Sequence, residues 1–153
     1  MKARLPKLAR QPFYVHGLLC ESIRPEASGT ATLVGVFREG LFVDEFPGNL
    51  VNISGLAWIC WAVGRPSPQN FTAILQTPDG TEHSSGPLLM PAIPPPTPDT
   101  LRHSIEIVVS YSMVPIVEPG TVRFIVEVDG RRYLASGLRI VRRPEAPTPP
   151  AAS

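Results

Sequence analysis

Histidine and cysteine are the residue types in this chain best suited to hold a metal ion, and the sequence contains three histidines and two cysteines. His16 and Cys20 stand four residues apart, in a stretch that alternates as a strand does. Four residues of strand span about 13 Å, whereas two ligands of one ion lie much closer together. His83 and His103 flank a proline-rich stretch, and we interpret both as surface histidines. We therefore predict no metal site and no cofactor.

Nucleophilic catalysis needs a cysteine or serine beside a base in an electropositive niche. Cys20 and Cys60 lie in apolar runs, where burial raises the pKa of a thiol and makes it inert. Ser84 and Ser85 follow His83 directly, but neighbouring residues of a strand point to opposite faces. The sequence also has no glycine-rich phosphate loop and no nucleophile elbow. We predict no catalytic residue and expect a protein that is not an enzyme.

The charges nearly balance, with 14 basic and 13 acidic residues, which argues against a general attraction to nucleic acid or to an anionic membrane. No apolar run of about 18 residues is present, so we expect no membrane-spanning segment. Basic residues near the start predict a flexible, solvated arm over residues 1–11, and they are Lys2, Arg4, Lys7 and Arg10. Because this start does not lead into a continuous apolar core, we expect a cytoplasmic protein with reduced thiols.

Residues 50–62 are the stretch around which the other elements must be arranged, because they are apolar on both faces of a strand. One face carries Val51, Ile53, Ala57, Ile59 and Trp61, and the other carries Leu50, Leu56, Trp58, Cys60 and Ala62. The edge strand of an open sheet keeps one face polar. We therefore predict a central strand that is covered on both sides.

Alternating apolar residues predict further strands, separated by turns rich in proline and glycine, at residues 13–23, 30–37, 71–76, 81–85, 105–113, 121–128 and 131–141. No stretch has a helical period. We predict an all-β protein, an antiparallel β-sandwich of seven to eight strands with an immunoglobulin-like arrangement. It forms a single domain over residues 12–142 with a proline-rich loop at 86–100, followed by a disordered proline-rich tail at 143–153.

Two acids stand between two aromatic residues in the connecting segment ahead of the central strand, in the order Phe42, Asp44, Glu45 and Phe46. One interpretation is structural, with the rings closing the end of the sandwich and the carboxylates solvated. The alternative is a contact surface for a partner. Both interpretations stay open at this stage.

Several short motifs occur together between residues 18 and 141, namely 20–24 (CESIR), Gly29, 33–37 (LVGVF), 42–47 (FVDEFP), 118–120 (EPG) and 129–130 (DG). As a set they resemble an uncharacterised bacterial family of small β-sandwich proteins. The sequence departs from that family at Val122, where an aromatic residue is common, and in its longer proline-rich loop. The resemblance implies a β-sandwich fold and a bacterial or phage origin, and it implies no catalytic residues.

A two-layer sandwich covers only one face of each sheet, so the surplus of apolar strand faces, above all Trp58 and Trp61, predicts an exposed apolar surface. Our first hypothesis is a non-enzymatic interaction module that self-associates or docks on a protein partner. The second is a phage or virion accessory domain. The third is a small-ligand or carbohydrate binder that uses Trp61, Tyr111 or Tyr133 as a stacking platform. Burial of both tryptophans within the monomer would remove the basis of the first hypothesis.

Overall fold

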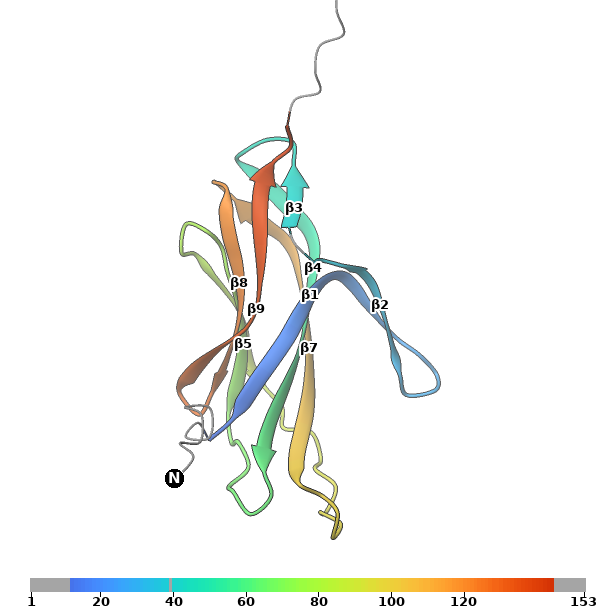
Figure 1. The fold of residues 1–153 in the computed structure, drawn as a ribbon. Helices are drawn as coiled ribbons and strands as arrows, with labels where there is room; N and C mark the ends of the chain where they lie inside the picture. Colours follow the sequence, from blue (N-terminus) through green and yellow to red (C-terminus); the bar gives the residue numbers. More distant parts are fainter. Residues whose placement is uncertain (1–11, 39, 145–153) are drawn as a thin grey trace, which may run out of the picture.

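The computed structural model describes residues 12–38 and 40–144, which form nine strands and no helix (Figure 1). The strands are β1 (Tyr14–Pro25), β2 (Ala31–Val36), β3 (Gly40–Val43), β4 (Gly48–Ala62), β5 (Phe71–Gln76), β6 (Glu82–Leu88), β7 (Arg102–Ile116), β8 (Gly120–Val128) and β9 (Arg131–Arg142). The predicted arm at residues 1–11 and most of the predicted tail at 143–153 lie outside the described residues. No helix long and apolar enough to cross a membrane is found in the part of the chain that the structure describes.

The nine strands form two sheets that face each other over one hydrophobic core. One sheet has four strands in the order β2-β1-β4-β7, and the other has five in the order β3-β9-β8-β5-β6. The prediction of an all-β protein is confirmed, but there are nine strands where seven to eight were expected. The additional strand is β3, in a segment expected to be a connection. It pairs with β9 in parallel, so the predicted purely antiparallel arrangement is wrong at this edge.

Strand β4 is central in its sheet, as predicted, with β1 on one side and β7 on the other. The side chains of Ile53, Ile59 and Trp61 belong to the core between the two sheets. On the opposite, outer face of β4, Leu56 is only 3% exposed and Cys60 is also buried. The predicted cover on both sides is confirmed for these residues. It is wrong at the start of the strand, where Val51 is 63% exposed and Leu50, predicted on the opposite face from Ile53, belongs to the same core as Ile53.

Met113 departs from the regular alternation of β7. The sequence predicts an inward side chain at this position, but Met113 is 58% exposed and has a φ angle of 55°. The pairing of β7 with β4 has no partner for this residue, and Val114 and Ile116 beyond it are buried. The prediction is wrong because a local irregularity with positive φ reverses the faces of the strand, which a period-two pattern does not anticipate.

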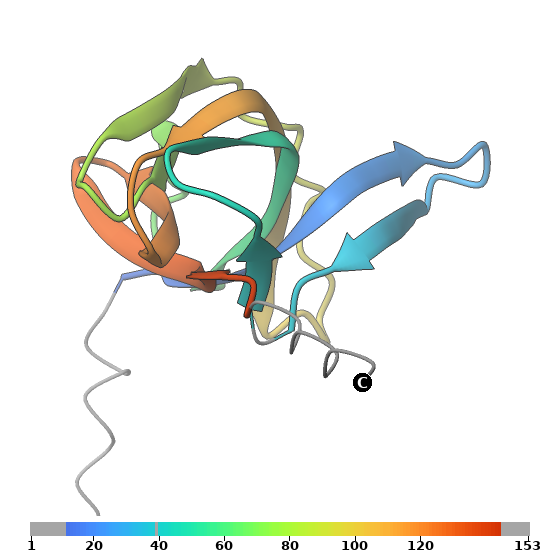
Figure 2. The same cartoon turned by 90° about the horizontal axis from the view of Figure 1, so that it is seen from above.

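Strand β1 pairs with two different strands along its length. Its first half, from Tyr14 to Cys20, pairs with β4, and its second half pairs with β2. Beyond Cys20 the two strands continue as a ribbon that projects away from the two sheets (Figure 2). We call residues 21–36 the β1–β2 ribbon, because β2 pairs with β1 alone.

Candidate functional site

The two tryptophans of β4 occupy different environments. Trp61 is 3% exposed and lies in the core, where its ring packs edge-on against Phe13, with ring centroids 6.4 Å apart. Trp58 lies on the outer face of the sheet and is half-buried. Because β4 alternates, residues three apart point to opposite faces. The expectation that Trp61 contributes to an exposed surface is therefore corrected, whereas Trp58 remains accessible.

Trp58 ends a short ladder of aromatic rings on the outer face. The ring of His16 is stacked on the indole at 5.1 Å with an interplanar angle of 18°, and the ring of Tyr14 lies 5.2 Å from His16. The pairing of β1 with β4 sets this geometry, because it places His16 directly opposite Trp58. Tyr14 and His16 are both exposed. The ladder thus leads from the start of β1 to Trp58.

Beside Trp58 lies a groove of about 540 Å³ between the β1–β2 ribbon and the outer face of β4 and β7. We call it the outer groove and define it by Ile23, Leu33, Leu56, Trp58, Glu106 and Val108. Ile23 and Leu33 are partners across the ribbon, and Leu56 pairs with Val108 across β4 and β7. The groove is therefore walled by apolar side chains from four strands.

Glu106 is the only charged residue among those that line the outer groove in the part of the chain that the structure describes. It pairs directly with Trp58 across β4 and β7, and it is exposed. The remaining lining consists of apolar side chains and small residues of the ribbon turn. A surface of this kind suits an apolar group that carries a positive charge at its edge.

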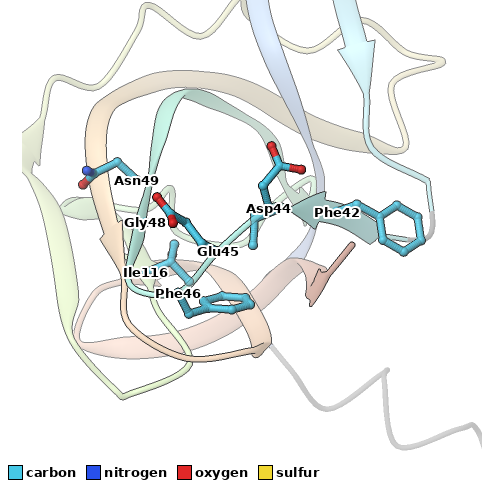
Figure 3. A pocket seen from close by; sticks show the side chains of 8 residues that line it. Phe42, Asp44, Glu45, Phe46, Gly48, Asn49 and Ile116 are labelled. Atoms are coloured by element: carbon cyan, nitrogen blue, oxygen red, sulfur yellow. The ribbon is translucent and has the colours of Figure 1, made fainter. Parts of the chain in front are cut away.

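The segment around Asp44 lines a second, smaller pocket of about 330 Å³ at one end of the molecule (Figure 3). Phe46 packs against the core, as the structural interpretation expects, but Phe42 is 55% exposed and points away from the pocket. Asp44 and Glu45 are exposed, and a carboxylate oxygen of Asp44 lies 3.0 Å from Nε of Arg143. An ion pair this exposed contributes little stability. We call the pocket that this segment lines the end pocket.

A family described as a family of unknown function (DUF6941) matches residues 16–141 of the chain. The chain belongs to this family. The match includes all nine strands apart from the first two residues of β1 and the last residue of β9. It confirms the predicted relationship to a family of uncharacterised proteins. No curated protein matches the chain.

The histidines and cysteines of this DUF6941 domain are dispersed. His16 and Cys20 pair with residues of β4 that are four positions apart, Trp58 and Ser54. No group of three or more potential metal ligands occurs among the described residues. Cys20 and Cys60 are free and buried, and burial raises the pKa of the Cys20 thiol. The Sγ of Cys60 lies 3.4 Å from the hydroxyl of Ser104.

The three residues considered as a stacking platform do not meet. Trp61 is in the core, and the half-buried Tyr111 lies eight positions further along the same β4–β7 ladder, opposite Ile53. Burial raises the pKa of the Tyr111 hydroxyl, which has no hydrogen-bond partner in the described structure. Tyr133 belongs to the other sheet and packs against the core. In this family member a flat ligand would therefore find the ladder at Trp58 and not a platform of these three rings.

Sequence reasoning found Trp58 but missed the ribbon side of the outer groove. The sequence analysis placed Ile23 and Leu33 in strands but did not assign either residue to a surface. One feature of the sequence could have indicated them. Both are apolar residues of the hairpin beyond Cys20, where β1 no longer pairs with β4. The point at which a strand leaves its sheet depends on twist and has no residue pattern of its own.

Proposed function

We propose that this protein is a non-enzymatic interaction module whose outer groove binds an apolar segment of a protein partner. The observation that carries the proposal is the half-buried Trp58 in a groove walled by Ile23, Leu33 and Val108. Tryptophan anchors in apolar pockets with a polar rim supply much of the binding energy at protein interfaces. Val108 is 46% exposed, so the groove offers accessible apolar surface.

The ribbon supports this proposal by its position. Strand β2 adds no side chain to the set of buried residues that forms the core. A two-stranded ribbon is marginally stable alone in water, so a second apolar surface against Ile23 and Leu33 would stabilise it. A partner that enters the groove would provide that surface.

The test compares two tagged variants, each with one aromatic residue removed, expressed in the cells from which the protein comes. Trp58→Ser alters the outer groove, and Phe42→Ser, which removes an exposed aromatic ring beside the end pocket, is the control. A partner identified by mass spectrometry is then purified and its dissociation constant measured. We expect Trp58→Ser to weaken binding by about tenfold or more, the loss typical of an anchor residue, and Phe42→Ser to leave it unchanged. Equal affinity for both variants would refute the proposal.

Self-association through the edge of β2 is a second candidate function, favoured by one observation. Strand β2 is outermost in its sheet, and its six residues, ATLVGV, contain no charge and no proline. Such an edge is open to pairing with another strand. Light scattering of the wild type would then give a dimer, and Val34→Lys would give a monomer. A monomeric wild type removes this candidate.

For the fold, we propose the immunoglobulin-like arrangement within the two-sheet architecture. The five-stranded sheet contains the order β9-β8-β5-β6, which corresponds to strands G, F, C and C′ of a variable-type domain. Strands β4 and β7 then correspond to B and E, which are neighbours in the facing sheet. Superposition of an experimental structure on immunoglobulin domains is the test, and a different strand correspondence would reject it.

A further inference from the structure

Three side chains from neighbouring strands form one row across the outer face of the four-stranded sheet. His16 of β1 pairs with Trp58 of β4, and Trp58 pairs with Glu106 of β7. Residues directly opposite each other in a sheet point to the same face. The indole of Trp58 therefore stands between an imidazole on one side and a carboxylate on the other. Trp58 and Glu106 both line the outer groove.

The two faces of the Trp58 ring have different surroundings. The imidazole of His16 is stacked on one face, with the ring centroids 5.1 Å apart and an interplanar angle of 18°. The other face is turned away from β1, toward the side of β4 on which β7 lies. No second aromatic ring packs on Trp58 among the described residues, and Trp58 is only half-buried. We call this second face the open face of Trp58, and a planar group can stack on it.

Glu106 supplies a negative charge on the same side of the ring. It is exposed, and its carboxylate forms no ion pair within the part of the chain that the structure describes. The one arginine of β7, Arg102, is four residues away, which is about 13 Å along the strand. The carboxylate is therefore available to a cation that enters the outer groove.

Arginine is the side chain that complements both the open face of Trp58 and the carboxylate of Glu106. Its guanidinium group is planar, stacks on tryptophan and donates two parallel hydrogen bonds to a carboxylate. A lysine ammonium group carries the same charge but does not stack as a plane. An uncharged apolar side chain covers Trp58 but surrounds the carboxylate of Glu106 with apolar groups and no counter-charge, which is unfavourable. An acidic side chain is repelled.

The rest of the groove determines which residue accompanies the arginine. Leu56 and Val108 form the next row on the same face, two positions from the row of Trp58. Rows on one face of a sheet are about 7 Å apart, which is also the spacing of residues i and i+2 in an extended peptide. Ile23 and Leu33 wall the groove from the ribbon. A large apolar residue two positions from the arginine therefore meets apolar side chains on both sides.

We propose that the partner segment places an arginine in the outer groove, with its guanidinium stacked on the open face of Trp58 and hydrogen-bonded to Glu106. A large apolar residue two positions away packs against Leu56 and Val108. The inference rests on the proposed function and names the chemistry of its partner, an extended apolar segment that contains an arginine.

The first test is selection from a displayed library of random peptides, with the full-length protein and its Trp58→Ser variant as parallel targets. We expect the peptides recovered on the wild type alone to share an arginine with a large apolar residue two positions away. Peptides that depend on Trp58 but lack arginine would overturn this inference and leave the proposed function standing. If no recovered peptide depends on Trp58, or none is recovered, the proposed function fails as well.

The contact with Glu106 is tested by titration calorimetry with one selected peptide. Replacing its arginine by glutamine should weaken binding to the wild type by about tenfold or more, and Glu106→Gln should weaken binding of the unchanged peptide similarly. The two replacements together should weaken binding by clearly less than the product of the separate factors, because they remove one shared contact. Glu118→Gln, which removes an exposed carboxylate that does not line the groove, is the matched control and should leave the affinity unchanged. Independent, multiplying losses would overturn the proposal.

The position of the arginine is read from the nuclear magnetic resonance signals of the two indole N–H groups. The signal of Trp58 should shift when the peptide binds, whereas that of Trp61 in the core is the internal reference. N-acetylarginine amide, a probe without a large apolar side chain, should shift the Trp58 signal but bind at least about tenfold more weakly, because it leaves Leu56 and Val108 uncovered. Equal affinity of the probe and the peptide would overturn the proposal in favour of a site for small guanidinium compounds. A Trp58 signal that stays in place while the peptide binds would overturn it too.

Discussion

Gly55 of β4 lies against the ring of Phe124 of β8, so closely that a Cβ atom at position 55 would come within 2.5 Å of Cζ of the ring. The two residues come from facing sheets, and Phe124 is fully buried. The contact therefore fixes how closely the sheets approach at the centre of the core.

Replacing Gly55 by alanine should destabilise the protein. The added methyl group would force the ring of Phe124 or one of the sheets to move, and overpacking of this kind costs about 1–3 kcal/mol. Urea denaturation measures the change in the free energy of unfolding. Gly137→Ala is the matched control, because a Cβ atom there would meet only ordinary contacts, the nearest at 3.5 Å from Thr121. A similar loss in both variants would show that the contact with Phe124 is not the cause.

The two tryptophans should respond very differently to substitution. Trp61→Ser removes a core ring that packs on Phe13 and should cost about 3–5 kcal/mol of unfolding free energy. Trp58→Ser removes a half-buried ring and should cost about 1 kcal/mol. Thermal and urea unfolding of the two variants check this difference. If Trp58→Ser is the more destabilising change, Trp58 is a structural residue and the outer groove loses its anchor.

Neither thiol should react in the folded protein. Cys20 is buried, and burial is the main cause of the raised pKa of its thiol. At pH 8 we expect Ellman's reagent to modify Cys20 and Cys60 at least about a hundredfold more slowly than in urea, because both require local opening. A raised pKa in the folded state also means that stability is lost as the pH rises above the ordinary pKa of a thiol. Rapid modification of Cys20 at pH 8 would contradict its position in the structure.

Acid should weaken the contact between β6 and β9. Glu82 accepts two hydrogen bonds from the guanidinium of Arg132, at 2.7 and 3.1 Å, and they hold the pKa of Glu82 below its ordinary value. The stabilising effect is present above the ordinary pKa and is lost as the pH falls through the lowered one. The unfolding free energy of Glu82→Gln should therefore change less between pH 5 and pH 3 than that of the wild type.

Glu118→Gln is the control for this acid profile. Glu118 is exposed and forms no ion pair with any residue that the structure describes. Its variant should follow the wild-type profile. The explanation fails if both variants flatten the curve to the same extent.

Local patterns predicted the parts of the fold that depend on neighbouring residues. The two strands on either side of the turn at Asp129 and Gly130 were both predicted, at residues 121–128 and 131–141, because turn residues and alternation act over a few positions. The parallel pairing of β3 with β9 was missed. Its four residues join segments that are nearly a hundred positions apart and leave no local signal.

The candidate site also combines features that local sequence predicts with features that depend on tertiary packing. Trp58 could be predicted because it lies on a strand that is apolar on both faces. The sequence alone, however, does not distinguish Trp58 from Trp61 as a surface residue. Which face of β4 meets the facing sheet is decided by the packing of both sheets, and only the structure separates the two residues. Ile23 and Leu33 gain their place beside Trp58 from the departure of β1 from the sheet, which is likewise a tertiary feature.

The long ladder between β4 and β7 has a consequence during synthesis. It pairs Gly48 with Ile116 and Ala62 with Arg102, so β4 leaves the ribosome well before its partner is made. Until β7 emerges, a strand that is apolar on both faces has one unpaired edge, which is a state prone to aggregation. Pairings this distant in sequence also slow folding. Recovery of soluble protein should therefore depend on the rate of translation and on chaperone capacity more than the stability of the finished fold would suggest.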